Sequence, residues 1–460
     1  MRSAKVMRNT RRCGAVPWVL AALAALAALP LRAVTDDERV AIYTEFRGLF
    51  DAGQYAAALP VAERLVASTE EQYGAKDRAL ANPLANVGTT QLRLGNFKAA
   101  EEAYRRALSI LDGVAPATDR ARLRPLQGLG ITYARTDQPG PAADTLKRAV
   151  DLSRNVEGLY NFDQLDFVKA LIDVYVAQNR LEDAEREHQY AFRIAETAYG
   201  RNDRRMLAAY DYLARWYEYV GRYTTARTEQ LRALRLAEAT SGRGSVATVE
   251  PLRGIARAYR LEYLYGPEVT QESTSTDPVL FSTNPGAGQT PTRLHPEGER
   301  ALQLALEAAK RATPPVPALL GGTLVDTGDW YLTEGDNRGA LDAYRKAWDA
   351  LATAGDTKLV EAPRLLRYKP PSASITRFTG GDIDDFEEYV VLAKFTVKAN
   401  GRASDIVTSS DNAPKENQEG VAAALRKALY APRLDHGAPV ETTGVTLTER
   451  LLVRKPDRKP

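Results

Sequence analysis

The chain has 460 residues, of which 44% are hydrophobic, and this length is ample for several hydrophobic cores. Its 62 Lys and Arg residues nearly balance its 59 Asp and Glu residues, which argues against nucleic acid as a general partner. Cys13 is the single cysteine, so a disulfide within the chain is excluded.

Residues 1–33 have the layout of a secretory signal. A basic opening, Arg2 to Arg12, precedes an apolar run from Ala15 to Leu31, and Arg32-Ala33 follows. We expect cleavage after Ala33. The alternative is an uncleaved anchor, but the run is shorter than the roughly 20 residues that a membrane-spanning helix needs. Residues 1–33 contain six basic residues and no acidic ones, so cleavage leaves 56 basic and 59 acidic residues.

An export signal on a chain without further cysteines favours a periplasmic location. The alternative is an inner-membrane protein that faces the periplasm. Association with a membrane is expected only if the N-terminal segment stays uncleaved.

A 42-residue period dominates the sequence from residue 34 to 355. Turn-forming residues mark this period at Gly53, Gly95, Asp137, Asn179 and Gly221. Alanine follows five residues after every one of them, and another alanine follows twelve residues after each of the last four. A fixed period with small residues in constant phase indicates stacked repeats.

Each period reads as a helix, a tight turn and an antiparallel helix. In the second copy, apolar residues recur at helical spacing up to Leu94, Gly95-Asn96 interrupts them, and Phe97, Ala100 and Tyr104 resume the pattern. This arrangement resembles the tetratricopeptide repeat, and its length resembles the repeats of kinesin light chains. The usual period of that family is about 34 residues, so each helix here is roughly one turn longer.

Seven copies can be counted, which predicts a mostly α-helical solenoid of about seven helix pairs. The sixth copy contains an insert at about 264–296 that is rich in Ser, Thr, Pro and Gly. We expect this insert to be disordered, and the alternative is a segment that folds over the solenoid groove or binds a partner.

After Gly355 the helical period ends, and we expect a linker at 356–386 followed by a small α+β domain at 387–460. Alternating residues predict its strands, and Asn400-Gly401 predicts a two-residue hairpin turn. The expected elements are strands at 389–398, 402–409 and 443–453 and a helix at 417–429.

This domain resembles the C-terminal domain of TonB. The matching residues are Phe395-Thr396-Val397, Asn400-Gly401-Arg402, the helix ending at Leu429-Tyr430, and Ala431-Pro432. The resemblance implies that a strand edge, here 443–453, captures an extended segment of an outer-membrane transporter by strand addition. Two departures argue against energy transduction: the N-terminal apolar segment has no histidine, and repeats replace the Pro-rich spacer.

The sequence predicts no catalytic residue, no metal site and no cofactor. The three histidines, His188, His295 and His436, have no second His or Cys at ligand spacing. The position of His188 within its repeat indicates a packing or capping residue. No phosphate-binding loop and no nucleophilic serine elbow are present.

We expect the first helix of each repeat to line a groove that binds a protein or an extended peptide, as in tetratricopeptide proteins. Arginine is prominent among the expected groove residues, and its guanidinium group suits carboxylates and peptide backbones. The alternative is a solvated face with internal Arg–Asp pairing. The candidate groove residues are Asn82, Arg93, Arg124, Gln127, Arg135, Lys169, Asp173, Arg215, Arg253 and Arg257.

These observations together predict an exported, non-enzymatic scaffold with a groove site and a strand-edge site. The alternative function is a TonB-like accessory of outer-membrane transport or energy transduction.

Overall fold

The computed structural model describes residues 35–266, 294–375 and 385–455. The expected signal segment, most of the expected insert and residues 376–384 of the expected linker lie outside the described residues. The described residues form two compact units, unit 1 within residues 1–159 and unit 2 within residues 160–460. Each unit is described by itself.

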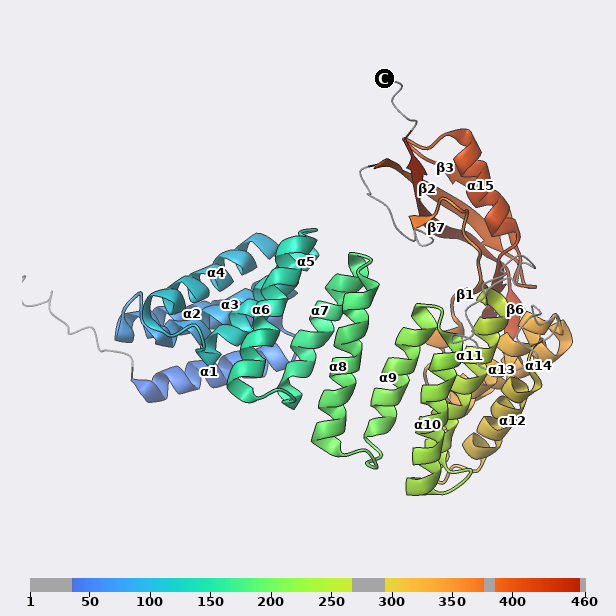
Figure 1. Cartoon of the computed structure of the whole chain (residues 1–460), viewed down its shortest axis with the longest axis horizontal. Helices are drawn as coiled ribbons and strands as arrows, with labels where there is room; N and C mark the ends of the chain where they lie inside the picture. The colour runs from blue at the N-terminus through green and yellow to red at the C-terminus, as the bar shows by residue number, and fades with distance from the viewer. Residues whose placement is uncertain (1–34, 267–293, 376–384, 456–460) are drawn as a thin grey trace, which may run out of the picture. The chain divides into compact units, whose positions relative to one another are not determined.

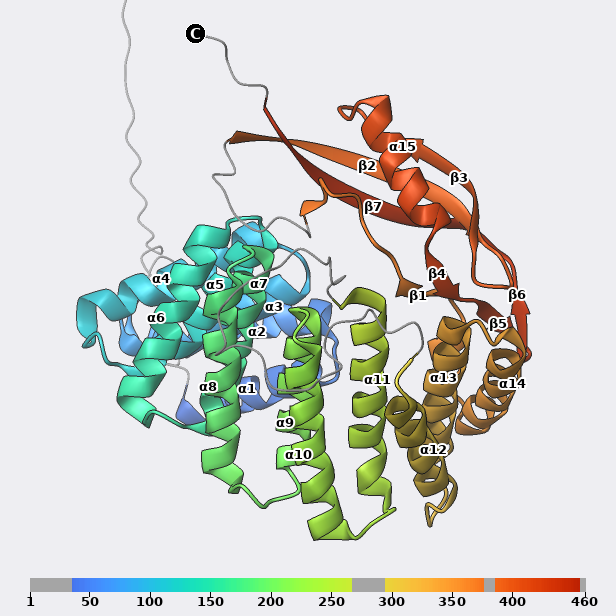
Figure 2. The same ribbon diagram turned by 45° about the vertical axis from the view of Figure 1, so that its right-hand side comes forward.

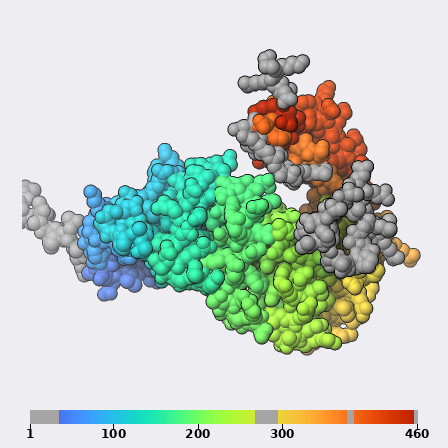
Figure 3. Space-filling model, in the orientation of Figure 1, coloured from blue at the N-terminus to red at the C-terminus, as the bar shows by residue number. Residues whose placement is uncertain are grey.

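Unit 1 consists of three antiparallel helix pairs, and side chains fill the spaces between neighbouring helices (Figures 1 and 3). Its helices are α1 (Asp36–Asp51), α2 (Tyr55–Tyr73), α3 (Ala81–Arg93), α4 (Phe97–Val114), α5 (Leu123–Arg135) and α6 (Pro139–Glu157), with 3-10 turns η1 (Arg78–Leu80) and η2 (Arg120–Arg122).

The turn inside each pair has the same backbone geometry. Gly53, Gly95 and Asp137 have φ angles of 72°, 81° and 56°. In each turn the next residue donates its N–H to the carbonyl five positions earlier; Asn96 to Gln91, at 2.9 Å, is one example. This bond satisfies a carbonyl that the ending helix would leave unpaired. The residues that mark the period are therefore the residues that must adopt a left-handed backbone.

The alanines of the period lie where helices touch. Ala58, Ala100 and Ala142 are completely buried, as are Ala107 and Ala149. A larger side chain at these positions would push neighbouring helices apart, because protein interiors are close-packed.

Unit 2 begins with four helix pairs, in which Asn179, Gly221 and Gly335 continue the positive φ angles of the turns. The helices are α7 (Leu165–Ala177), α8 (Leu181–Tyr199), α9 (Met206–Tyr219), α10 (Tyr223–Ser241), α11 (Val249–Tyr265), α12 (Pro296–Lys310), α13 (Pro317–Glu334) and α14 (Asn337–Ala354), with 3-10 turns η3 (Phe162–Gln164), η4 (Val246–Thr248) and η5 (Lys358–Val360). The described residues therefore contain seven helix pairs in all, which confirms the predicted mostly helical fold.

The C-terminal part of unit 2 is a small antiparallel β-structure. A three-stranded sheet has the order β3-β2-β7, and α15 lies across one of its faces (Figure 2). Val391, Ala393 and Phe395 of β2 pack with Val421 and Leu425 of α15 in the core between them. The elements are β1 (Arg364–Arg367), β2 (Phe386–Val397), β3 (Ala403–Ser409), α15 (Lys415–Arg426), β4 (Leu429–Ala431), β5 (Arg433–Asp435), β6 (Ala438–Val440) and β7 (Thr442–Arg454).

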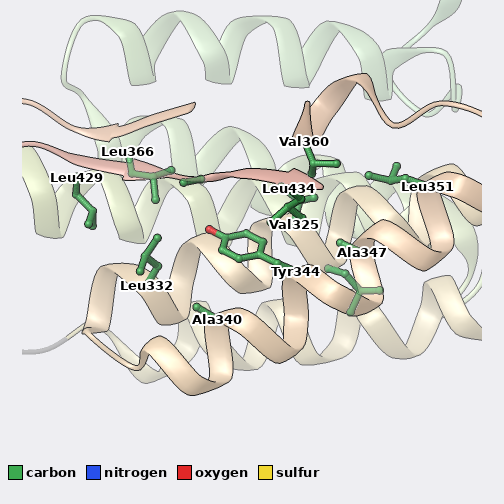
Figure 4. Packing of buried hydrophobic residues seen from close by; sticks show 12 residues of the cluster. Val325, Leu332, Ala340, Tyr344, Ala347, Leu351, Val360, Leu366, Leu429 and Leu434 are labelled. Carbon is green, nitrogen blue, oxygen red and sulfur yellow. The ribbon is translucent and has the colours of Figure 1, made fainter. Parts of the chain in front are cut away.

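Two short strand pairs, β1-β4 and β5-β6, join this β-structure to the last helix pair. Figure 4 shows Leu366 of β1, Leu429 of β4 and Leu434 of β5 in one cluster with Leu332 and Tyr344 of α13 and α14. The last repeat and the C-terminal strands therefore share one hydrophobic core.

A buried ion pair strengthens the same junction. Asp329 of α13 is 1% exposed, and Arg364 of β1 donates two hydrogen bonds to its carboxylate, at 3.0 and 2.7 Å. The Tyr344 hydroxyl donates a third, at 2.8 Å. Burial alone would raise the pKa of Asp329, but Arg364 and Arg260 hold that pKa below its usual value.

The structure differs from the sequence prediction in three details. The hairpin between β2 and β3 is a three-residue loop, 399–401, in which only Gly401 has a positive φ; the predicted two-residue turn is therefore wrong. A side chain at Gly401 would strike the Tyr430 carbonyl, at 2.1 Å. The expected linker contains η5 and β1, and the expected helix ends at Arg426 because Leu429 belongs to β4.

Candidate functional site

The first-helix face of unit 1 carries five of the ten sequence-predicted residues. Asn82 and Arg93 lie on α3, and Arg124, Gln127 and Arg135 lie on α5. Asn82 and Arg124 are one period apart, and so are Arg93 and Arg135, so each pair occupies equivalent positions in consecutive repeats. All of them except the half-buried Gln127 are exposed.

Asn82 and Arg124 also line a pocket of about 290 Å³ within unit 1. The guanidinium of Arg124 donates to the side-chain oxygen of Asn86 at 2.9 Å, and Asn86 is 2% exposed. This bond connects α5 to α3 and orients the Arg124 side chain. The full lining consists of Arg39, Val40, Tyr43, Leu65, Thr69, Ala79, Asn82, Pro83, Asn86 and Arg124.

On the α3 and α5 part of this face, the arginines have no acidic partner among the described residues, whereas Arg39 of α1, which also lines the pocket, pairs with Asp36 at 2.9 Å. Arg93, Arg124 and Arg135 take part in none of the ion pairs found within the part of unit 1 that the structure describes. Tyr104, beneath the face, donates its hydroxyl to Thr89 at 3.0 Å. Burial raises the pKa of Tyr104, while the charges of Arg124 and Arg93 act in the opposite direction. The face is therefore cationic and rich in amides.

The arginines of unit 2 lie in a different environment. Arg257 donates to the Glu218 carboxylate at 3.0 and 2.8 Å, and Arg253 donates to Asp326 at 2.5 Å. Arg215 donates to Asp211 at 2.8 Å. The Arg257 bonds link α9 to α11 and the Arg253 bond links α11 to α13, whereas the Arg215 bond lies within α9. All of them match the internal pairing of arginines with carboxylates that is the alternative for the groove.

Lys169 and Asp173 extend from α7 toward an aromatic group on α8 and α9. The Lys169 ammonium is 5.9 Å from the centre of the Tyr212 ring. Desolvation by neighbouring side chains raises the pKa of Asp173, although the residue is exposed, and burial raises the pKa of Tyr212 to about 12. His188 stacks on Trp216 with ring centres 4.4 Å apart, which is the packing role predicted for it.

Some residues that decide which candidate arginines are paired lie outside the set predicted from the sequence. Asn86 holds Arg124 and Asp326 holds Arg253, and neither was predicted as a groove residue. Helical spacing places Asn86 one turn after Asn82, so it could have been found in the sequence. Asp326 is 73 residues from Arg253, and no local pattern predicts their contact.

The described residues were also compared with the requirements of a metal site and of a membrane-spanning helix. Within 35–266, 294–375 and 385–455, no cluster of three His, Cys, Asp or Glu side chains is arranged to hold a metal ion. None of the helices in these ranges combines the length and apolar character needed to cross a membrane.

Comparisons with known proteins agree with this construction. Residues 48–112, from the end of α1 into α4, match the family model of the tetratricopeptide repeat. No curated protein matches the chain, and no enzyme family is indicated.

Several solved structures are similar to parts of the chain. A putative kinesin light chain of Podosopora anserina with nearly identical TPR-like repeats is 17% identical over 44% of this chain and 94% of its own, with a TM-score of 0.39. The C-terminal part of a TPR protein from Cytophaga hutchinsonii is 14% identical over 69% and 97%, with a TM-score of 0.40. YrrB, described as a TPR protein with an unusual peptide-binding site, is 15% identical over 54% and 94%, with a TM-score of 0.31.

Residues 48–112 thus match the tetratricopeptide repeat, and the other helix pairs of the described residues share its construction of two antiparallel helices joined by a tight turn.

Proposed function

We propose that this protein is an exported, non-enzymatic scaffold that binds an extended peptide on the first-helix face of unit 1. The observation that carries the proposal is the contrast between the two units. In unit 2 the candidate arginines are neutralised by carboxylates of the chain itself, whereas Arg93, Arg124 and Arg135 of unit 1 are exposed and have no acidic partner among the described residues.

The chemistry of this face defines the peptide. Arg124 and Asn86 lie side by side in the pocket and offer a guanidinium and an amide, which bind carboxylates and peptide carbonyls. Arg93 and Arg135 extend the positive charge along α3 and α5. The expected ligand is therefore an extended segment that carries acidic side chains or a free carboxyl terminus.

A charge-reversal experiment tests this site. Arg93, Arg124 and Arg135 are replaced by Glu in the full chain, and binding is measured against an array of eight-residue acidic peptides. Losing charge-assisted hydrogen bonds and adding repulsion should weaken binding at least about tenfold. The control reverses the exposed Lys98 and Arg148 on the second helices α4 and α6. If the triple-Glu variant and the control variant bind the peptides equally well, the peptides do not bind at Arg93, Arg124 and Arg135.

Export is a separate part of the proposal and rests on the sequence of residues 1–33. We expect the mature protein to begin at Val34, and the mass of the protein purified from its native host measures this directly. A protein that keeps residues 1–33 and sediments with membranes would favour the anchored alternative.

A second candidate function is strand addition at the C-terminal sheet, in the manner of a TonB-like accessory. It is supported by the position of β7 at the edge of the sheet, next to β2. The expected partner is an extended segment, and outer-membrane transporters are the class of protein that the TonB resemblance suggests.

Proline substitution tests the strand-edge function within the intact chain. The Leu452 amide of β7 points away from β2, and the Thr448 amide does so too because it lies four residues earlier in the same strand. Thr448→Pro therefore removes a donor on the outer edge without removing a hydrogen bond to β2. Capture of transporter segments by the wild type and by Thr448→Ser, but not by Thr448→Pro, is the expected result. Equal capture by all three proteins would exclude the outer edge of β7 as the binding site.

A further inference from the structure

The outer edge of β7 is already occupied in part by the chain itself. The Leu452 amide donates to the Ala373 carbonyl at 2.6 Å, and Ser374 forms an antiparallel bridge with Leu451. Residues 368–375, named here the strap, therefore cover the C-terminal end of the edge. Pairing of β7 with β2 is regular from residue 445 to 454.

Along the rest of the edge the backbone groups point outward in a predictable pattern, and those of Thr446 and Thr448 have no outer partner among the described residues. Successive residues of an antiparallel strand direct their N–H and C=O groups to opposite sides. Since the Leu452 amide points away from β2, those of Arg450, Thr448 and Thr446 do too. These three residues are exposed. A strand that follows the edge from Thr446 toward Leu452 therefore meets the strap.

The strap also satisfies a buried carboxylate. Glu449 of β7 is 6% exposed and faces the core side of the sheet. It accepts a hydrogen bond from the Tyr368 hydroxyl at 2.8 Å and another from the Ser374 hydroxyl. A buried carboxylate without donors is costly, so any segment that replaces the strap must bring a donor of its own.

The beginning of the strap is tied to the helices. The Tyr265 hydroxyl, at the end of α11, donates to the Leu366 carbonyl at 3.3 Å and accepts from the Tyr368 amide at 3.0 Å. Arg364 is held by Asp329. Residues beyond Tyr368 can therefore leave β7 while the preceding strand β1 stays in place. Such a tethered segment competes with a partner at a high effective concentration.

We propose that the strap is an exchangeable internal occupant of the β7 edge, and that a partner strand displaces it by placing an Arg or Lys side chain against Glu449. An Arg or Lys side chain brings a positive charge to Glu449, so it adds an ionic attraction that the two neutral hydroxyl groups lack. This inference rests on the strand-edge function proposed above and adds to it both a regulatory step and a requirement for a basic residue in the partner.

A redox lock tests the inference in the full chain. Ala373 and Leu452 form the hydrogen-bonded pair next to the bridge between Ser374 and Leu451, so Ala373→Cys and Leu452→Cys are introduced together, with Cys13→Ser to remove the single native thiol. Oxidation closes the strap and reduction frees it. The probe is a labelled synthetic peptide of residues 366–375 with Ser374→Arg, and the variants with a single introduced cysteine control for oxidation itself.

We expect the reduced protein to bind this peptide at least ten times more tightly than the oxidised protein. Glu449→Gln in the reduced protein should weaken binding by a similar factor, with folding checked by circular dichroism, and the unmodified peptide should bind less tightly than the Arg peptide. Equal affinity in both redox states would show that the strap does not compete with the peptide. Strand addition at Thr446 and Thr448 would then remain supported. Binding to neither form would overturn both proposals. An unchanged affinity in Glu449→Gln would overturn the basic-residue requirement.

Discussion

The pKa of a single side chain depends on how far the fold removes that side chain from water, and His188 is the clearest case. It is 6% exposed, stacks on Trp216, and its Nδ1 has no hydrogen-bond partner within 35–266, 294–375 and 385–455. Desolvation lowers its pKa from 6.5 to about 4. The folded protein therefore keeps this imidazole neutral at a pH where an unfolded chain would protonate it.

This shift predicts a loss of stability in acid. Between pH 6.5 and 4 the unfolded state binds the extra proton, so the stability contributed by neutral His188 is complete above pH 6.5 and falls as the pH drops toward 4. The expected loss is on the order of 1–3 kcal/mol. Urea unfolding at pH 7 and pH 4.5 measures it, and His188→Phe should reduce the difference.

The control for this prediction is His436, whose side chain is 93% exposed. His436→Gln should leave the pH dependence of the wild type unchanged. If His188→Phe and the wild type lose the same stability between the two pH values, the buried histidine is not the cause.

Among the helices, close contact depends on glycine at particular positions. A Cβ built on Gly128 of α5 would lie 2.1 Å from Cζ of Tyr104, and one on Gly88 of α3 would lie 2.7 Å from the same ring. Tyr104 of α4 is 1% exposed, so its ring has little room to move. The ring therefore fills the space that the two glycines leave between the helices.

We expect Gly128→Ala to destabilise unit 1 by about 1–3 kcal/mol, because the added methyl group overpacks the contact with Tyr104. Gly113, near the end of α4, is the matched control, since a Cβ there meets nothing within 4 Å. Gly113→Ala should be neutral or stabilising by up to about 1 kcal/mol. Thermal unfolding compares the two variants; a larger loss in Gly113→Ala would contradict the packing argument.

A second set of residues with the 42-residue period lies just before the first helix of each repeat, and it is not part of the sequence prediction. Asp77, Asp119, Asn161 and Asp203 each accept a backbone N–H two residues later, and they are spaced 42 residues apart. These side chains begin the turn that leads into the first helix of each repeat. The period was therefore marked by polar residues between repeats as well as by glycines within them.

Within unit 2, the last repeat and the C-terminal strands fold around one hydrophobic core. Leu434 of β5 is 2% exposed and belongs to the cluster that contains Leu332, Tyr344 and Leu351 of the last helix pair. Separating the repeats from the strands between 355 and 361 would open this cluster. Experiments on either part alone would therefore test a damaged core.

Leu434→Ala should consequently weaken both parts together. We expect a loss of about 2–5 kcal/mol from the cavity, with faster hydrogen exchange in α14 as well as in β5. Leu392→Ala is the control, because Leu392 of β2 is 44% exposed on the open face of the sheet. Faster exchange confined to β5 would mean that the shared core does not couple the two parts.

Much of the architecture was predictable because it repeats. Small and turn-forming residues in constant phase predicted the helix pairs, and alternation predicted the hairpin, the helix and the last strand in the correct order. These features depend on backbone preferences and on periodic burial, which act over a few residues. The predicted hairpin turn is instead a three-residue loop, and its Gly401 carbonyl accepts the Tyr430 amide at 2.8 Å, a contact across 29 residues that no local pattern contains.

The sequence by itself determined the repeat, the positions of its turns and the set of polar residues on the first helices. Only the tertiary structure decided which of those residues are paired. Arg93 and Arg257 look alike along the chain, yet Arg257 meets Glu218 from another helix while Arg93 has no acidic partner among the described residues. The strap was equally invisible, because the contact of Tyr368 with Glu449 spans 81 residues. Ion pairs and edge contacts of this kind depend on distances in space, and no local period encodes them.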